Sequence, residues 1–313
     1  MNSFKARLIA AGCVLTVSAA GCTHRVSASK PAPTIPAPAA APQPSVETPA
    51  CHDSAVTSVA RNTGESLEML MGGSAAVDGM NFVLPTSVRS QFPEVRAGEV
   101  AGSSGGPADL HTAYDRAFNA GAFVYGHPYF NAELRNSSRQ AVTIYDIRPV
   151  NLRTLCLPSG LLAMYGAEGG DSEAMEFDLD ADRPIARVPP GEDEAGLPYF
   201  QSHMIEIAAA DTSWLDMTFT LAKRARSFDV AISYASGGRK YVQVLKNGSQ
   251  PFRAMPATCP AADDRDHLSD LDVQRLAAHR FDEVLVQGEL SSQGQPTMKE
   301  EDPNTFAADC VTR

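Results

Sequence analysis

The sequence predicts a mainly β protein, an antiparallel immunoglobulin-like β-sandwich with a few peripheral helices. Short runs from residue 120 onward alternate between apolar and polar residues, which is the period of a half-buried strand. Clusters of Gly, Asn, Ser and Pro separate these runs, and no regular helical pattern stands between them. A doubly wound α/β fold would alternate strands with helices, so the pattern favours packed antiparallel sheets.

The first 21 residues have the pattern of an export signal. Lys5 and Arg7 precede an apolar stretch at 8–20, which is too short to span a hydrocarbon core about 30 Å thick. The stretch ends in SAAGC at 18–22, a run that resembles the bacterial lipobox. That resemblance implies that residues 1–21 are removed and that Cys22 receives a lipid anchor, including palmitate, as the mature N-terminus.

A lipid on Cys22 would hold the protein at the outer face of the cytoplasmic membrane. Each buried methylene contributes about 0.8 kcal/mol, so two or three acyl chains give a lasting anchor. Ala19 stands where the commonest lipobox has Leu, and this departure leaves an alternative open. Ordinary signal peptidase would then cut after a small residue and release a soluble secreted protein.

Residues 22–50 are predicted to form a disordered linker. They include seven prolines among Ala, Ser and Thr and almost no large apolar residue, so they cannot bury enough surface to fold. Polyproline geometry, at about 3.1 Å per residue, would let the linker reach about 80 Å from the bilayer. The composition and the anchor together resemble secreted lipoproteins of high-GC Gram-positive bacteria. An S-x-x-K motif at 27–30 is a chance match, because no S-D-N or K-T-G accompanies it.

The chain is acidic, with a formal net charge of −11. Loss of Lys5 and Arg7 with the signal peptide removes two positive charges and brings the mature protein to −13. An excess of negative charge disfavours binding to nucleic acid, anionic lipid and polyanionic wall polymer. We therefore expect no nucleic-acid partner and a membrane contact made through the anchor.

Four cysteines follow Cys22, namely Cys51, Cys156, Cys259 and Cys310. An even number in an oxidising compartment predicts two disulfide bonds, for which three pairings exist. We prefer Cys51 with Cys156 and Cys259 with Cys310. None lies in a C-x-x-C motif, which disfavours a zinc site and thioredoxin-like redox chemistry.

The exported part divides into three predicted regions. Residues 51–119 are expected to be irregular or helical and to pack on the sandwich, with helices at 65–71 and 109–119. Residues 120–256 form the sandwich, in which a hairpin joins 123–134 to 142–147 through a turn at 136–138. Residues 257–313 are a C-terminal extension with one amphipathic helix, from near Ser269 to near Gly288. Further strands are predicted at 152–156, 175–179, 203–208, 215–221, 228–234 and 241–245.

The order of several short motifs resembles a group of uncharacterised actinobacterial envelope proteins. The motifs are LRNSS at 134–138, VTI at 142–144, FDLD at 177–180, YF at 199–200, GG at 237–238 and PFR at 251–253. The likeness spans about residues 120–253. It implies a β-sandwich and supplies no activity.

Acidic residues near one predicted strand form a candidate metal site. Asp178, Asp180 and Asp182 have the one, three, five spacing of a calcium loop. Arg183 stands where an EF-hand needs Gly, and Pro189 where it needs Glu, so an EF-hand is excluded. A looser calcium site is the alternative to the solvated acidic loop that we expect, and no other cofactor is predicted.

Other candidate residues have a structural explanation as well as a functional one. His279, Asp282 and Glu283 would be neighbours on one helix face, where they could hold a metal or simply form a polar surface. Trp214 begins a predicted strand, and we expect it in the core or at its rim rather than as a sugar-stacking platform. The chain has no H-E-x-x-H motif and no G-x-S-x-G nucleophile elbow, so no catalytic residue is predicted.

Together these features predict a lipid-anchored, surface-displayed envelope protein that is a non-catalytic binding or interaction module. Its expected partner is another envelope protein or a wall component. Two alternatives stay open. One is an envelope hydrolase or metal-dependent enzyme whose site is assembled from residues distant in sequence. The other is the substrate-binding lipoprotein of an importer, which would require two α/β lobes.

Overall fold

The computed structural model describes residues 53–54, 60–64, 66–76, 81–99, 108–165, 174–260, 265, 268–292 and 297–312. The chain divides into two units, 1–49 and 50–313, and all described residues belong to the second. The predicted signal peptide, Cys22, the linker, the S-x-x-K motif and Cys51 therefore lie outside the described residues. In the described part, no helix has the length and apolar character that a membrane crossing requires.

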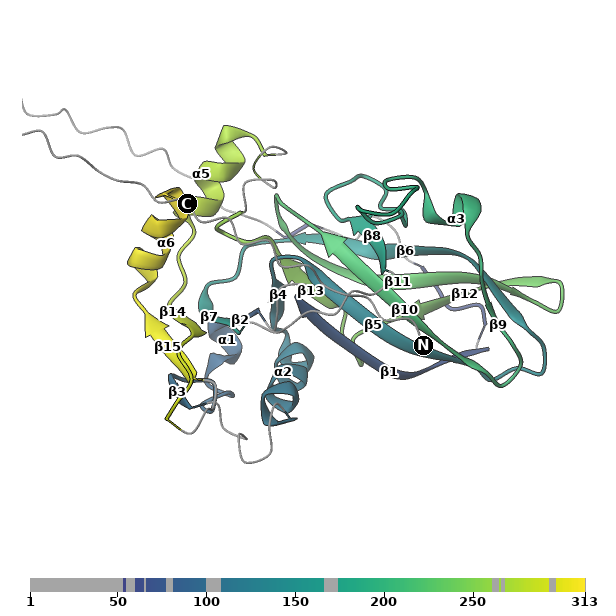
Figure 1. Cartoon of the computed structure of the whole chain (residues 1–313), viewed down its shortest axis with the longest axis horizontal. Helices are drawn as coiled ribbons and strands as arrows, with labels where there is room; N and C mark the ends of the chain where they lie inside the picture. The colour runs from purple at the N-terminus through teal and green to yellow at the C-terminus, as the bar shows by residue number, and fades with distance from the viewer. Residues whose placement is uncertain are drawn as a thin grey trace, which may run out of the picture. The chain divides into compact units, whose positions relative to one another are not determined.

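The described residues form a mainly β domain with two sheets (Figure 1). The small sheet consists of β1 (Leu67–Ala76), β5 (Pro128–Asn136), β8 (Ala174–Asp178) and β10 (Thr212–Thr220). Its strand order is β1-β5-β10-β8. The prediction of a mainly β protein with few helices is confirmed.

The large sheet runs through the whole domain. Its strands are β2 (Phe82–Pro85), β3 (Gly98–Glu99), β4 (Phe123–Tyr125), β6 (Val142–Leu155), β7 (Gly160–Met164), β9 (Ile205–Ile207), β11 (Ala225–Ser236), β12 (Arg239–Leu245), β13 (Phe252–Met255), β14 (Glu283–Gln287) and β15 (Thr297–Glu301). Their order is β3-β15-β14-β7-β2-β4-β13-β11-β6-β9, and β12 also pairs with β11. The helices are α1 (Thr86–Arg89), α2 (Ala108–Ala120), α3 (Tyr199–Ser202), α5 (Asp270–Ala278) and α6 (Pro303–Thr312).

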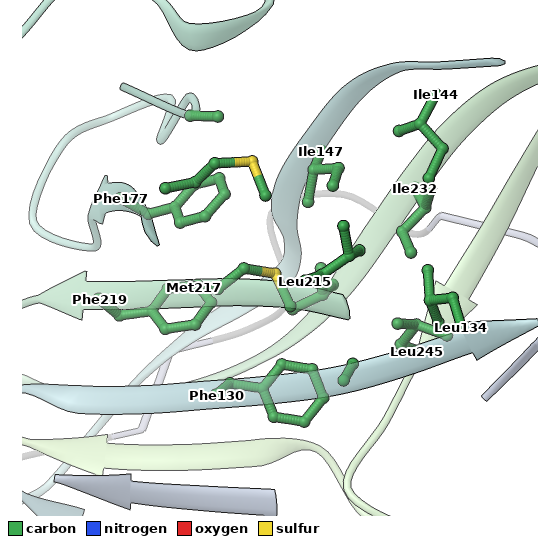
Figure 2. Close-up of a cluster of buried hydrophobic side chains, with 14 of the residues drawn as sticks. Phe130, Leu134, Ile144, Ile147, Phe177, Leu215, Met217, Phe219, Ile232 and Leu245 are labelled. Carbon is green, nitrogen blue, oxygen red and sulfur yellow. The ribbon is translucent and has the colours of Figure 1, made fainter. Parts of the chain in front are cut away.

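We call the small sheet together with β6, β9, β11 and β12 the sandwich part. Alternate side chains of these strands point into one core between the two sheets. Phe219 of β10 and Phe228 of β11 meet there with ring centroids 4.8 Å apart. Figure 2 shows Phe130 and Leu134 of β5 in the same cluster as Ile232 of β11. Each such buried side chain contributes about 1.5–3 kcal/mol, so this core holds the two sheets together.

We call β2, β4, β7, β14 and β15, with α1, α2, α5 and α6, the helix-covered part. The central strands of this part, β2, β4 and β7, are buried on both faces. Phe82 and Leu84 of β2 share one core with Tyr114 of α2, and the rings of Phe82 and Tyr114 lie 5.4 Å apart. Val83 points the opposite way, into a core against which Phe306 of α6 packs. Figure 1 shows α2 and α6 with this end of the large sheet between them.

The prediction of a purely antiparallel fold is wrong. β8 runs parallel to β10, β4 runs parallel to β13, and β7 runs parallel to β14. Alternation of apolar and polar residues shows which face of a strand is buried but not which way its neighbour runs. β7 is moreover buried on both faces, which is the usual setting of parallel strands.

The predicted hairpin around Asn136 is also wrong. β5 pairs with β1 and β10 in the small sheet, whereas β6 pairs with β9 and β11 in the large sheet. The chain therefore crosses from one sheet to the other at 137–141. Asn136 is fully buried at this crossing. Its Nδ2 donates to the carbonyls of Gln140, Ile207 and Ala208 at 2.7–3.0 Å, and its Oδ1 accepts from the backbone N–H of Ser138 at 3.0 Å.

Two helical predictions need correction. Residues 67–71 belong to β1 rather than to a helix. The C-terminal helix begins as predicted after Ser269, whose Oγ accepts from the N–H of Asp272 at 3.2 Å, but it ends at Ala278. Residues 283–287 form β14, because a short apolar run fits a buried strand as well as a helix. A second C-terminal helix, α6, was not predicted.

Residues 51–119 were expected to be irregular or helical, but β2 and β3 lie there as well as β1. The other secondary-structure predictions are confirmed. The helix predicted at 109–119 is α2, and the six further strands lie in β6, β8, β9, β10, β11 and β12. Gly237 and Gly238 form the turn between β11 and β12, with φ of 56° and 75°. Positive φ at both central residues is what a tight two-residue hairpin requires.

Candidate functional site

A polar pocket with a volume of 500 Å³ lies on the face of the large sheet that is turned away from the sandwich core. Phe228 and Val230 of β11 point into that core, so Ser227 and Asp229 point to the opposite face. The described residues that line the pocket are Asp53, Asn151, Arg153, Leu155, Ser227, Asp229, Lys246, Gln250, Pro251 and Arg253. Its size is within the range of small-molecule sites in proteins.

A β-bulge in β6 shapes the floor of this pocket. The register with β11 shifts between Ser227 and Asp229, so β6 carries one extra residue there. Asn151 lies at the bulge and has a φ of 54°. This left-handed backbone costs of order 1–3 kcal/mol for a residue other than Gly, and bulges often re-aim side chains beside functional sites. Here the bulge directs the amide of Asn151 to Asp229.

Asp229 is a buried carboxylate at the pocket floor, only 4% exposed. Its Oδ2 accepts from Asn151 Nδ2 at 2.7 Å, and its Oδ1 has no hydrogen-bond partner among the described residues. Asn151 Oδ1 in turn accepts from the N–H of Ala60 at 2.9 Å, which sets the orientation of the amide. A buried acceptor without a partner costs about 1–3 kcal/mol, so Oδ1 is an unsatisfied polar atom below the surface of the pocket.

Three positively charged side chains line the pocket: Arg153, Lys246 and Arg253. Arg253 has structural contacts, because its Nη1 donates to the carbonyl of Gly121 at 3.1 Å and its guanidinium lies 5.8 Å from the ring centroid of Phe123. Arg153 and Lys246 are exposed and form no ion pair within the described part of the chain. The described lining thus carries three cations against two carboxylates, Asp53 and Asp229, a small positive excess in an acidic protein.

A second hollow of 450 Å³ adjoins the first and shares Asp53, Leu155 and Arg253 with it. Asp53 Oδ1 accepts from the N–H of Cys156 at 3.0 Å, and the N–H of Ser54 donates to the carbonyl of Thr154 at 2.9 Å. These bonds hold residues 53–54 against the end of β6, at the border of the two hollows.

The structure places the three predicted calcium residues in different settings. Asp180 is engaged by the protein: its Oδ2 accepts from the backbone N–H groups of 222–223 at 2.7 and 2.8 Å, and its Oδ1 lies 3.8 Å from Arg226 Nη2. Asp178 and Asp182 are exposed. Among the described residues, no three His, Cys, Asp or Glu side chains are placed to hold a metal ion. Calcium binding stays a prediction that this geometry does not support.

The second metal candidate is dispersed, because the helix that would align it ends at Ala278. His279 Nε2 lies 3.1 Å from a backbone carbonyl, that of residue 158, and burial lowers the pKa of its imidazole. Asp282 Oδ2 accepts from a threonine hydroxyl, that of residue 86, at 2.7 Å. Glu283 forms an ion pair with Arg89 at 2.8 Å. Each of the three side chains thus has a structural partner.

Trp214 and the cysteines occupy different settings. Trp214 is 50% exposed on β10, so it lies at the rim rather than in the core. Cys156 and Cys259 are disulfide-bonded. Cys51 and the side chain of Cys310 lie outside the described residues, so the preferred pairing stays a prediction. The position of Asp53 beside Cys156 is consistent with a bond from Cys51 to Cys156.

The pocket residues were not among the predicted site residues. Asp229 occupies a polar position of an alternating strand, which in a sequence looks like any solvent-facing residue. Its burial depends on residues 53–54, the bulge and the loop at 246–251, which come from distant parts of the chain. The only signal in the sequence was that Asp229 is an acidic residue within a mostly apolar predicted strand, at 228–234.

Comparison with protein-family models, with curated proteins and with solved structures gives no match to this chain. The resemblance to actinobacterial envelope proteins therefore stays a prediction from the motifs.

Proposed function

We propose that this chain is an exported, lipid-anchored envelope protein whose folded domain is a non-catalytic binding module. The observation that carries the binding role is the pocket at the bulge in β6, whose lining combines the buried carboxylate of Asp229 with the exposed cations of Arg153 and Lys246. Its described lining includes no histidine, the commonest general base of hydrolytic sites, to activate Ser227. This set of groups suits recognition of a ligand better than proton transfer to it.

The N-terminal sequence supports display at the membrane surface. In this proposal Cys22 carries the lipid, residues 22–50 are the spacer, and the domain from about residue 51 reaches its partner beyond the bilayer. Release as a soluble secreted protein is the alternative for this part of the proposal. The finer assignment to an immunoglobulin-like class is also part of it, supported by two sheets around a shared core.

The anchor is tested by labelling cells with a clickable palmitate analogue and separating membrane from soluble fractions. We expect label and membrane retention in the natural chain and in Cys13→Ser, whose substitution lies within the apolar stretch of the leader. We expect both to be lost in Cys22→Ser. Retention of label in Cys22→Ser would contradict the anchor, and an unlabelled natural chain in the medium would support the secreted alternative.

The binding role is tested by crosslinking intact cells that express the full precursor, with Asp229→Asn and Lys299→Met versions in parallel. Lys299 is exposed on β15 and is not among the pocket residues, so it is a matched surface control. We expect a reproducible envelope protein or wall fragment that is captured by the natural chain and by Lys299→Met and reduced in Asp229→Asn. Turnover of an envelope substrate that the pocket variant abolishes would instead establish an enzyme.

A further inference from the structure

We propose that the pocket at the bulge binds a small organic anion that carries a hydrogen-bond donor, a hydroxyl or an ammonium group, close to its anionic group. This inference rests on the proposed binding role and names the ligand chemistry. Its basis is the juxtaposition of one unpartnered, buried acceptor with two unpaired cations in a pocket of 500 Å³.

The donor half of the ligand is specified by Asp229. Asp229 is 4% exposed, and its Oδ1 is an unsatisfied acceptor that water does not reach and that has no partner among the described residues. A ligand donor must therefore displace the side chains that cover this atom. A ligand hydroxyl or ammonium that donates to Oδ1 satisfies this atom with a charge-assisted hydrogen bond. A ligand with only acceptors would face the carboxylate unfavourably, so the site selects for a donor at this position.

The anionic half is specified by Arg153 and Lys246. Arg153 is paired in register with Ser227 across β6 and β11, which places it next to the pocket floor. Lys246 is at the end of β12, where the loop at 246–251 leaves the sheet. A guanidinium presents several donors to a carboxylate or phosphate, and an ammonium adds a second positive charge, so both favour an anion.

The bulge preorganises the site. Asn151 is held between Ala60 and Asp229 by hydrogen bonds of 2.9 and 2.7 Å, so its amide and the carboxylate it contacts have one defined orientation. Groups that are fixed before a ligand arrives lose little conformational entropy on binding. The positive φ of Asn151 lies at the bulge, and this backbone conformation directs the amide toward Asp229.

The experiment is isothermal titration of the mature chain, carrying Cys22→Ser to avoid lipid, with four probes of defined chemistry. D-Glucuronate offers a carboxylate and hydroxyls, D-alanine a carboxylate and an ammonium, D-glucose hydroxyls alone, and acetate a carboxylate alone. We expect D-glucuronate or D-alanine to bind at least about tenfold more tightly than glucose and acetate, because only they engage both halves of the site. The better of the two identifies the donor as hydroxyl or ammonium.

Two pocket variants separate the halves. In Asp229→Asn the amide oxygen keeps the bond from Asn151 Nδ2, so the new NH₂ replaces the Oδ1 acceptor by a donor. We expect this variant to lose about tenfold in affinity for the donor-bearing probe while its affinity for acetate is unchanged or increased. In Lys246→Met the affinity for all three carboxylate probes should fall, whereas Lys299→Met should bind like the natural chain.

Three outcomes would overturn the inference. The first is equal binding of all four probes, the second is binding of glucose alone, and the third is an affinity that Asp229→Asn does not change. Each would show that the pocket does not recognise an anion that carries a hydrogen-bond donor. If none of the probes binds while crosslinking in cells captures a partner through Asp229, the ligand class is wrong and the binding role stands. If neither experiment shows binding, both proposals fail.

Discussion

The sandwich part and the helix-covered part bury their strands in different ways. In the sandwich part most strands have one face in the core, as in β5, where Phe130 and Leu134 are buried and Arg135 is exposed. The central strand β11 is the exception, because both of its faces are buried. In the helix-covered part Phe82, Val83 and Leu84 of β2 are all buried, because helices cover both faces of the sheet. Only the first arrangement produces an alternating sequence, so most strands of the sandwich part were predicted and β2, β7, β14 and β15 were not.

The two parts nevertheless share one sheet. β13 joins them: Phe252 and Ala254 belong to the sandwich core and Met255 to a core of the helix-covered part. The pocket lies where this continuity is disturbed, at the bulge in β6 and at the loop that leads from β12 into β13. The candidate pocket thus lies at the border of two differently packed regions, and the following predictions test whether the regions behave as one.

The largest effect is expected from the two predicted disulfide bonds. A bond from Cys51 to Cys156 would fasten the N-terminal arm to the sandwich part, and one from Cys259 to Cys310 would fasten α6 to the helix-covered part. Cys156→Ser and Cys310→Ser should each lower the free energy of unfolding by about 4 kcal/mol, measured by urea denaturation. Peptide mapping under non-reducing conditions checks the pairing, and a peptide that links Cys51 to Cys259 would contradict it.

Core truncations in the two parts should destabilise the domain next most strongly. Leu84→Ala in the helix-covered part and Leu134→Ala in the sandwich part remove fully buried side chains, and each should cost about 3 kcal/mol. Fluorescence of Trp214 follows the sandwich part, and helical circular dichroism follows the other part. Because the large sheet is shared, both signals should change in one transition in each variant.

Leu271→Ala is the matched control, since Leu271 is 74% exposed and should leave the midpoint unchanged. If the fluorescence and the circular dichroism change in two separate transitions, the two parts unfold independently. That result would contradict the prediction that the shared sheet unfolds as one cooperative unit.

Asn136→Ala should lower stability by about 2 kcal/mol, because it leaves several buried backbone groups at the sheet crossing without their partner. Asn304→Ala, on an exposed position of α6, should change stability by less than about 0.5 kcal/mol. Thermal denaturation of the two variants gives the difference. An equal effect of both substitutions would mean that the crossing does not depend on Asn136.

A smaller effect is expected at the start of α5. Ser269→Ala removes the cap whose Oγ accepts from the N–H of Asp272, and should weaken the helix by about 1 kcal/mol. Ser269→Asp keeps an acceptor at the same place and should restore it. Hydrogen exchange of the α5 amides measures the change, and unaltered protection in Ser269→Ala would show that packing alone holds the helix.

The smallest effect concerns pH and the helix-covered part. Burial lowers the pKa of His279 in the folded state below the ordinary value of 6.5, so the unfolded chain takes up the proton first as pH falls. The contribution of neutral His279 to the free energy of unfolding is complete above pH 6.5. This contribution is lost as the pH falls below that value. His279→Gln should reduce the loss of stability on acidification through this range, measured by urea denaturation at several pH values.

His203→Gln provides the control for this measurement, because His203 is exposed on the sandwich part. If His203→Gln reduces the pH dependence of stability as much as His279→Gln does, the effect comes from the loss of any histidine and not from the burial of His279.

Several features of the protein follow from local sequence alone. The acidic charge, α2 and the alternating strands depend on composition and on periods of two or 3.6 residues, which neighbours along the chain determine. The predictions of a leader and of a proline-rich linker rest on the same local information. The Gly237-Gly238 turn is equally local, since its positive φ values demand glycine or a similar residue.

Other features were decided only by the tertiary structure. The separation of β5 from β6 into different sheets, the parallel pairs and the strand identity of β1 and β14 depend on hydrogen-bond partners distant in the chain. The pocket is the strongest case, because Asp229 is an ordinary polar strand residue until Asn151, the arm at 53–54 and the loop at 246–251 surround it. Local periodicity specifies which face of a strand is buried, but burial of a polar atom and the charges around it depend on long-range packing.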